Sequence, residues 1–428
     1  MQGITGGLTL DQILPCPLST SPSGIIRVAD VRVGHEVFGA AGRVVPVVAI
    51  ADFSEAKLAR YRLDTGEEVR TAFDQPIPTM TAEERKLSAK RSDEYRARRR
   101  AARPSRAKAV SKKPGVSLKV TELNRQRQHA YLDPILPSPR LPAAIMASLL
   151  HSDGRELNHS VPVSVGVELP EATLPIEPYH FGAWLGDGYS AAGKIGMAQS
   201  DFELLFPYLP EPASKVVDPR PAYRRPFLIC RWDGMTTALR ELGVLKNKHV
   251  PAIYLRSSIA QRIALLQGLL DTDGTCNSRG QIEFSVTSQQ LIEGVLDLVA
   301  GLGIKVELRQ GPAKLYGRTV GTRGRLKFMA PFPAFRLPRK AERQKLKGFR
   351  PTTLRRYIAS AVEDEPAPVR AFAIGSADGV FLVGRSLIAV HGCPRLEAVA
   401  VERVPQTDAP STWLFTPLGQ WLSGRRTN

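Results

Sequence analysis

Two short segments of this 428-residue chain are similar in sequence, and this internal similarity constrains the fold more than any other feature. The first reads FGAWLGDG at 181–188 and the second reads QGLLDTDG at 267–274. Each is an apolar stretch with helical periodicity that ends in Asp-Gly. A glycine inside a helix costs up to about 1 kcal/mol relative to alanine, so its presence indicates a structural need. This similarity therefore predicts two similar helices in close contact.

The predicted contact surface consists of small residues spaced four positions apart, which lie on one face of a helix. Small side chains at this spacing let two helix backbones approach closely. They are Gly182 and Gly186 in the first segment, and Gly268 and Thr272 in the second.

One aspartate directly follows the second small residue in each segment, Asp187 in the first and Asp273 in the second. If the helices pack side by side, these carboxylates meet at one end of the interface, where they repel unless cations lie between them. Paired divalent metals held by acidic residues are a known device for in-line phosphodiester hydrolysis. The alternative is that each Asp-Gly only ends a helix. An EF-hand calcium loop starting at Asp271 is excluded, because Cys276 stands where that loop requires glycine.

The net charge of +18 is concentrated in two basic runs. Residues 85–113 hold thirteen Lys and Arg against two acidic residues, and residues 336–356 hold nine against one. Such focused charge favours a nucleic-acid partner, although a solvated helix face and a linker are the alternative. From these runs we expect the following DNA contacts: Arg98, Arg99, Arg100, Lys340, Arg343 and Lys345.

Several protein classes are excluded by what the sequence lacks. No stretch of about 18 apolar residues is present, so we expect no membrane-spanning helix. The N-terminus lacks the pattern of a secretory signal, which predicts a cytoplasmic protein of bacterial or phage context that is not secreted. The four cysteines are far apart and form no CxxC pair, which argues against a zinc site or a disulfide framework.

Secondary-structure patterning divides the chain into three parts. Residues 24–73 alternate β-branched and polar residues in what we expect to be short strands broken by turns, and strand character returns at 370–391. The middle has helical periodicity at 179–187, 197–207, 235–243, 257–270 and 287–302. Residues 80–128 are rich in Ala, Arg and Lys and predict either a surface helix or a disordered arm. This order predicts a β domain interrupted by an inserted α/β domain.

The two Asp-Gly segments resemble the paired motifs of LAGLIDADG homing endonucleases. The text around the second motif, LGVLKNKHVPAIYLRSSIAQRIALLQGLLDTDGT, is similar to that family, and the resemblance covers about residues 156–330. It implies a monomeric, pseudo-two-fold endonuclease that cuts double-stranded DNA with Mg²⁺. By this resemblance Asp187 and Asp273 are metal ligands and catalytic, and Asp271 is structural. Lys248 matches a functional lysine of the family; a phosphate contact or a plain surface position is the alternative.

The outer segments resemble the Hint domain of inteins, the module that splices proteins. The resemblance rests on 23–39, 64–75 and VFLVGRSLIAVHGC at 380–393. It implies an α+β fold in which an all-β, horseshoe-like Hint domain formed from both chain ends is interrupted by the α/β endonuclease domain of the dodecapeptide (DOD) type. The expected divisions are a Hint part at 1–80, a basic linker at 81–150, the endonuclease domain at 151–335, a second Hint part with a basic lead-in at 336–392, and a downstream tail at 393–428.

The departures from the Hint pattern indicate impaired splicing. His391 stands at the penultimate position and Cys393 at the place of the downstream nucleophile, but Gly392 replaces the final Asn whose side chain must cyclise. Gln75 stands where the assisting His is expected, and glutamine is no general base near neutral pH. Two alignments of the first splice residue remain open. In one it is Cys16, although a plain buried thiol is the alternative for this residue; in the other Gly7 occupies the position and no nucleophile is present.

Three hypotheses follow. The leading one is an intein-derived homing endonuclease with a degenerate Hint domain. The second is an active self-splicing or self-cleaving intein. The third is a DNA-binding remnant in which both activities are lost.

Overall fold

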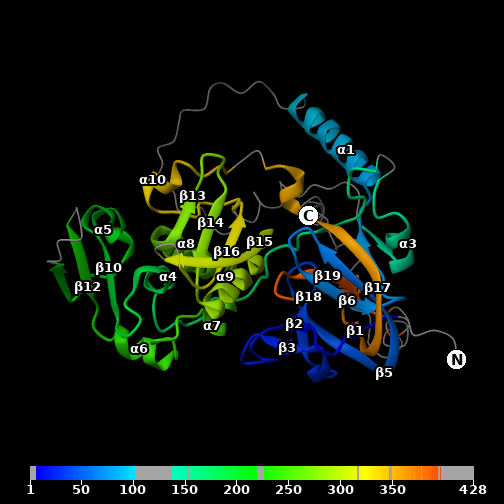
Figure 1. The fold of residues 1–428 in the computed structure, drawn as a ribbon, viewed down its shortest axis with the longest axis horizontal. Coiled ribbons are helices and arrows are strands. Elements are labelled where there is room, and N and C mark those ends of the chain that lie inside the picture. The colour runs from blue at the N-terminus through cyan, green and yellow to red at the C-terminus, as the bar shows by residue number, and fades with distance from the viewer. Residues whose placement is uncertain are drawn as a thin grey trace, which may run out of the picture.

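Both terminal parts of the chain enter one β-rich body, and the middle of the chain forms an α/β body beside it (Figure 1). The computed structural model describes residues 6–101, 137–151, 154–218, 226–315, 318–346, 349–376, 378–393 and 396. The expected fold class, a Hint-like β domain interrupted by an α/β domain, is confirmed.

The β-rich body is built on a six-stranded sheet with the order β4-β5-β6-β1-β17-β9. Because the strand from the C-terminal part, β17, pairs with β1 and β5 of the N-terminal part and with β9, neither terminal part completes the sheet alone. The strands are β1 (Leu8–Thr9), β4 (Glu36–Phe38), β5 (Val44–Leu63), β6 (Glu68–Ala72), β9 (Ser160–Pro162) and β17 (Arg355–Ile374).

The two longest strands, β5 and β17, differ from the short strands that the sequence predicts. Each is 20 residues long, and they pair antiparallel from Ile358 opposite Leu63 to Ile374 opposite Val47. The register shifts at several points along this ladder. Such irregularities bend a strand without ending it, which explains how one strand can run unbroken from 44 to 63.

Smaller elements complete this body. Three two-stranded ladders flank the main sheet: β2 (Ile13–Pro15) with β3 (Ile25–Arg27), β7 (Ile77–Thr79) with β8 (Ser138–Arg140), and β18 (Val380–Val383) with β19 (Ile388–His391). Helix α3 (Pro142–Ala147) and a 3-10 turn η1 (Val28–Asp30) lie beside them. Helix α1 (Ala82–Ala101) projects from the body (Figure 1), so the basic segment begins as a helix.

The α/β body has two halves, each with one of the motif helices and one antiparallel sheet. The first half contains α4 (Pro178–Asp187), α5 (Gln199–Leu205), η2 (Phe206–Tyr208), α6 (Met235–Glu241), and the sheet β10 (Lys194–Ala198), β12 (Phe227–Arg231), β11 (Ser214–Val217). The second contains α8 (Ile259–Asp273), α9 (Gln289–Gly301), and the sheet β13 (Gly274–Cys276), β14 (Ile282–Val286), β16 (Arg318–Phe328), β15 (Val306–Leu315).

All five segments with helical periodicity in the middle of the chain are helical, within a few residues of the predicted bounds. The short helices α7 (Ala252–Leu255) and α10 (Pro338–Ala341) were not predicted, because four residues are too few to show a period. None of the described helices has the length and apolarity needed to cross a bilayer.

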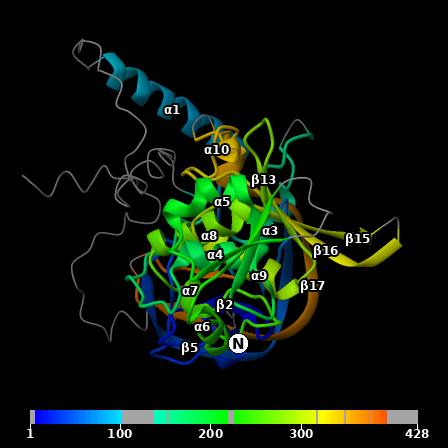
Figure 2. The same cartoon turned by 90° about the vertical axis from the view of Figure 1, so that its left-hand side faces the viewer.

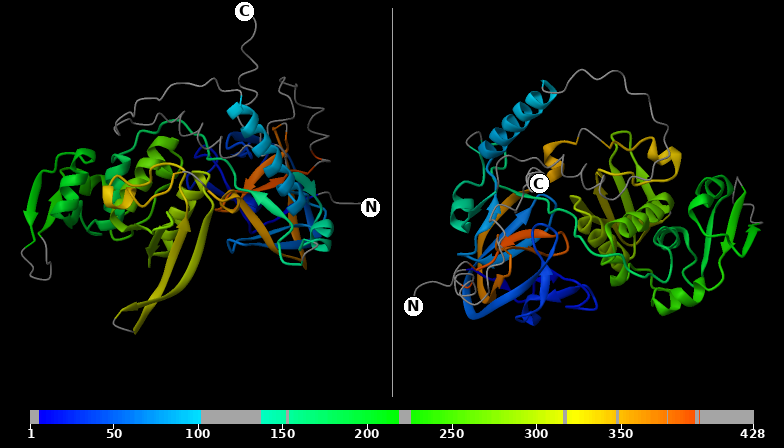
Figure 3. Two further views of the ribbon diagram at one scale, coloured as in Figure 1. Left: turned by 90° about the horizontal axis from the view of Figure 1, so that it is seen from above. Right: turned by 180° about the vertical axis from the view of Figure 1, so that it is seen from behind.

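The two halves differ most in one hairpin. Strands β15 and β16 are 10 and 11 residues long and extend away from the rest of the α/β body (Figure 3), whereas the strands of the first half have four or five residues. Near its base, Gly324 lies under α9, where a Cβ atom would come within 2.7 Å of Ile292.

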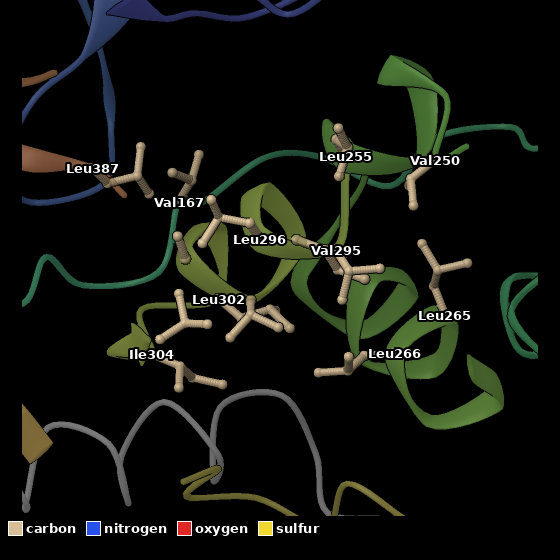
Figure 4. Close-up of a cluster of buried hydrophobic side chains, with 14 of the residues drawn as sticks. Val167, Val250, Leu255, Leu265, Leu266, Val295, Leu296, Leu302, Ile304 and Leu387 are labelled. Atoms are coloured by element: carbon tan, nitrogen blue, oxygen red, sulfur yellow. The ribbon is translucent and has the colours of Figure 1, made fainter. Parts of the chain in front are cut away.

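A continuous apolar core joins the two bodies. Leu387 of the β-rich body and Val167 of the connecting segment face Leu296 of α9 (Figure 4). At the same junction, Cβ atoms on Gly42 and Gly303 would come within 2.4 Å and 2.6 Å of the Gly166 backbone. These contacts require the backbones of three separate segments to pass very close together.

The chain crosses between the bodies at other points than the sequence predicts. Strand β9, at 160–162, pairs with β17 in the Hint-like sheet, although we placed it in the endonuclease domain. Conversely, residues 336–344, expected as a lead-in to the second Hint part, lie against α8, where Arg336 and Leu337 donate backbone hydrogen bonds to Asp271.

Candidate active site at the paired helix ends

Local sequence signals set the start of both motif helices. Helix α4 has Pro178 at its first turn, and the side chain of Glu177 accepts a hydrogen bond from the His180 N–H at 2.8 Å. Helix α8 begins with a reciprocal capping box between Ser258 and Gln261. Both devices satisfy N–H groups that a helix start leaves without partners.

The motif helices touch through their small residues. A Cβ atom on Gly182 would lie 2.1 Å from the Leu265 carbonyl oxygen, and one on Gly268 would lie 2.0 Å from that of Tyr179. A Cβ on Gly186 would lie 2.0 Å from Oγ1 of Thr272. No real Cβ atom tolerates such distances, so glycine is required at each of these positions.

The glycines that follow the aspartates end the helices for a steric reason. Gly188 and Gly274 have extended backbones, with φ of −72° and −85°, so no left-handed turn demands them. A Cβ on Gly188 would come within 2.3 Å of the Trp184 carbonyl oxygen, and one on Gly274 within 2.7 Å of Leu270. The chain therefore turns tightly back over its own last helical turn.

Asp187 and Asp273 meet at the shared C-terminal end of α4 and α8. The Asp273 carboxyl carbon lies 3.5 Å from the position of a Cβ on Gly186, the residue before Asp187. Both side chains reach solvent. Partial burial, and then the negative charge of Asp273, raise the pKa of Asp187 to about 6. Burial also raises the pKa of Asp273, against the opposing effect of two lysines. The surroundings of both side chains thus disfavour the ionised form of each carboxyl group.

Each helix end carries one lysine. Lys248 Nζ donates to the carbonyl oxygens of Gly186 at 2.9 Å and Gly188 at 2.7 Å, at the end of α4. Lys340 Nζ donates to three carbonyls at the end of α8, those of Leu270 at 2.8 Å, Asp271 at 2.7 Å and Thr272 at 3.1 Å. A cation is favoured at a helix C-terminus, where carbonyl groups lack partners. Burial lowers the pKa of both ammonium groups to about 8.

The placement of Lys340 corrects one expectation. The sequence places this lysine in an exposed basic run, whereas the structure leaves its side chain only 8% exposed. Its counterpart is Lys248: Lys248 follows Asp187 by 61 residues, and Lys340 follows Asp273 by 67. This matching spacing was the signal in the sequence that could have identified the second lysine.

Asp271 has a different environment from its neighbour two residues on. It is 3% exposed and accepts hydrogen bonds from the Tyr179 hydroxyl at 2.9 Å and from the backbone N–H groups of Arg336 and Leu337 at 3.0 to 3.1 Å. All of its bonds tie α8 to α4 and to the segment that follows β16. In this structure Asp271 is a buried residue that links these elements through hydrogen bonds.

The structure also brings the Hint splice positions together. The Gly7 N–H donates to Gln75 Oε1 at 2.8 Å, and Gln75 Nε2 donates to the His391 carbonyl at 2.5 Å. Gly6 is close to both Gln75 and Cys393, since a Cβ at Gly6 would lie 2.5 Å from Gln75 Oε1 and 3.6 Å from the Cys393 Cα. Gly392, between His391 and Cys393, donates its N–H to Gly379. Of the two alignments left open, this geometry matches the one that starts at Gly7.

Cys16 lies elsewhere, at the junction between the two bodies. Its carbonyl accepts from Arg256 Nε at 2.8 Å, and Arg256 also donates to the Gly24 carbonyl at 2.6 Å. The thiol is fully buried, and burial raises its pKa to about 11. A thiol so hard to ionise is a poor nucleophile, so this environment favours the alternative of a buried structural thiol for Cys16.

The remaining expected DNA contacts are only partly visible. Arg98, Arg99 and Arg100 lie on α1, and their side chains are outside the described residues. Arg343 and Lys345 are exposed, and Lys345 packs against Gly280 in the turn that precedes β14.

The glycine-packed helices that end in Asp187 and Asp273, each beside its own sheet, resemble the LAGLIDADG arrangement, and the β-rich body around them resembles a Hint domain. Residues 260–329, from α8 to β16, match the family described as LAGLIDADG-like domain. The chain is 29% identical over 393 residues to the replicative DNA helicase DnaB of Mycobacterium intracellulare. That match covers 91% of this chain and 59% of the helicase, so the chain spans about three fifths of the length of this relative.

Solved structures of both kinds are also similar to the chain. The homing endonuclease I-DmoI in complex with DNA and Ca is 13% identical, over 39% of this chain and 95% of that chain, with a TM-score of 0.27. The MchDnaB-1 intein is 27% identical, over 17% of this chain and 52% of that chain, with a TM-score of 0.15.

Proposed function

We propose that this protein is a site-specific homing endonuclease that cuts both strands of DNA with Mg²⁺, acting as a monomer whose two halves substitute for two subunits. The observation that supports this most directly is the meeting of Asp187 and Asp273 at the end of the glycine-packed helices, with one lysine at each end. The proposal implies a cytoplasmic location, where bacterial DNA is found.

The donor set fits magnesium. Among the described residues no group of three or more His, Cys, Asp or Glu side chains is arranged to hold a metal. Mg²⁺ is commonly bound by only one or two carboxylates together with substrate phosphates and water. Two carboxylates that repel each other, with pKa values raised by burial, are stabilised by a cation between them. When bound, the metal neutralises charge on the scissile phosphate and activates water.

The chain itself positions the reacting groups. Asp187 and Asp273 are held by helices that cannot slide, because the backbones meet at Gly182 and Gly268. Lys248 and Lys340 keep positive charge beside the carboxylates without forming ion pairs to them in the structure, since their ammonium groups bond to helix carbonyls. In that position the two ammonium groups can stabilise negative charge that develops on a phosphate.

The outward faces of the two sheets are the proposed surface for the DNA duplex. In the second half, Leu308 and Leu326 point toward the core, so the alternate positions on the same strands face outward. These positions include Arg309, Arg325 and Lys327, and the last two share an ion pair with Glu283 at 3.0 Å and 3.5 Å. Lysine and arginine on such a surface supply phosphate contacts.

We further propose that the Hint-like body no longer splices. Gly7 has no side chain to form the first ester or thioester, and Gly392 has none to cyclise, although both stand at the assembled centre. Expressing the chain and weighing it tests this: an intact product of 46.8 kDa is expected. A product that has lost residues 7–392 by ligation of the flanking segments would contradict it.

Cleavage of a randomised duplex library tests the nuclease. With Mg²⁺ present, sequencing of cut ends should reveal one long preferred site. Asp187→Asn and Asp273→Asn should abolish cutting and keep DNA binding, while the control Asp233→Asn, an exposed aspartate paired with Arg231, should cut normally. Binding without cleavage by the unchanged protein would favour the DNA-binding remnant instead.

A further inference from the structure

Residues 334–344, which we call the return segment, connect the two halves of the α/β body directly. The Arg336 guanidinium lies 4.0 Å from the centre of the Tyr179 ring in α4 and 4.6 Å from that of Tyr208 in η2, both in the first half. Its Nε also donates to Gln267 of α8 at 3.0 Å, in the second half. The segment therefore spans the pseudo-two-fold interface beside the paired aspartates.

Arg339 makes a second link across this interface. Its Nη2 lies 2.6 Å from Oδ2 of Asp201 and its Nε 3.3 Å from Oδ1, so the guanidinium grips the carboxylate with two nitrogens. Helices α10 and α5, which carry these residues, lie side by side in Figures 1 and 2. The side chain of Arg339 is 57% exposed and that of Asp201 is 24% exposed, so the pair is open to solvent.

This pair borders the candidate active site. Arg339 immediately precedes Lys340, whose ammonium lies on the carbonyls at the end of α8. The last of these carbonyls belongs to Thr272, the residue before Asp273. The Arg339–Asp201 pair therefore borders the helix end that carries this aspartate.

The chemistry of the pair favours exchange of partners. An exposed Arg–Asp pair contributes about 0 to 1 kcal/mol to stability, so little holds it closed. The planar guanidinium fits two oxygens of a phosphate as well as those of a carboxylate. We propose that Arg339 binds a DNA backbone phosphate next to the paired aspartates, and that Asp201 holds this arginine in place until DNA arrives. This inference rests on the proposed function and assigns one phosphate contact within it.

Binding to a 40-base-pair duplex of random sequence, without metal and over a series of salt concentrations, tests the inference. Arg339→Ala should weaken binding about tenfold and reduce the slope of log K against log salt by about 1, as expected for one lost phosphate contact. Asp201→Asn should bind as tightly as the unchanged protein or more tightly, because it releases the guanidinium. Arg60→Ala is the matched control, since Arg60 is a half-exposed arginine beside Asp364 on the Hint-like sheet.

Two results would overturn the inference. If Arg339→Ala matched the Arg60 control in affinity and salt slope, the arginine would contact no phosphate. If Arg339→Ala and Asp201→Asn weakened binding equally, the pair would only tie the two halves together. Because this assay needs no cleavage, it is separate from the nuclease test. Failure here leaves the role of Asp187 and Asp273 standing, and DNA cutting by their Asn variants would reject that role regardless of this result.

Discussion

The helix-end site and the Hint centre are both assembled from residues far apart in the sequence, but they differ in what the backbone presents. At the helix ends, glycines bring two backbones together so that side chains with charge, Asp187 and Asp273, project at their junction. At the Hint centre, by which we mean the residues bonded around Gln75, the sequence alignment places Gly7 and Gly392 where splicing needs reactive side chains. The comparison teaches that the same residue type has opposite effects: glycines between the helices bring carboxylates together, whereas Gly7 and Gly392 present no side chain at all.

The Hint centre has in addition adapted to glycine. Gly6 has φ of +102° and Gly7 of +149°, which side chains rarely adopt, and a Cβ on Gly7 would come within 3.0 Å of Val369. A cysteine at position 7 would therefore have a strained backbone, and it would lack the His and Asn partners that splicing needs. The backbone just before β1 therefore favours glycine at both positions.

The largest expected effect concerns the paired carboxylates. Replacing Asp187 or Asp273 with Asn should lower the cleavage rate about a thousandfold, the upper range for removal of one preorganised charged group, because the amide gives no negative charge to hold a cation. The measurement is single-turnover cutting of the site found in the library screen. Cutting within tenfold of the unchanged protein by both variants would remove the contrast between the two sites.

The second effect compares the lysines with each other. Lys248→Met and Lys340→Met should each slow cutting about a hundredfold, with DNA affinity changed far less, because each ammonium group lies at the end of one motif helix, where it can stabilise charge on a phosphate. Lys305→Met, which breaks an ion pair with Asp64 far from the site, is the control and should leave the rate unchanged. Nicking of a single strand by one variant and not the other would show which lysine serves which strand.

Much of the helix-end site could be predicted from the sequence, because its signals are local. The spacing of Gly182 and Gly186, the Asp-Gly ends and the helical periods lie within a few residues of each other. The environment of Lys340 could not be predicted, because this lysine lies 67 residues after Asp273 in the sequence and becomes buried only when the return segment packs against α8. The same holds for the 20-residue length of strand β5, which depends on pairing with β17 from the other end of the chain.

A third prediction examines whether the Hint-like frame is a structural support. Gln75→Ala removes three hydrogen bonds and leaves the buried Gly7 N–H without its acceptor, so we expect a loss of about 1 to 3 kcal/mol in the free energy of unfolding. Denaturant unfolding measures this, and cleavage below the melting temperature should be unaffected. A fall in the cleavage rate of the folded variant would mean that the two sites are coupled.

The smallest effect tests the electrostatic cost of the paired aspartates through pH. The folded-state pKa of Asp187 is about 6 and its ordinary value is 3.8, so the folded chain holds this proton more tightly than the unfolded chain does. Without metal, the free energy of unfolding should therefore fall as pH rises from about 4 to about 6, and should stay reduced above that range.

Asp187→Asn removes the ionisable group and should raise the melting temperature by roughly 2 °C at pH 8 with no gain at pH 4. Asp271→Asn should instead lower the melting temperature, because its carboxylate accepts from three donor groups, the Tyr179 hydroxyl and the N–H groups of Arg336 and Leu337, which an amide cannot all satisfy. Equal melting temperatures of Asp187→Asn and the unchanged protein at pH 8 would mean that the carboxylates at the helix ends do not repel, and that the argument for a cation between them has lost its physical basis.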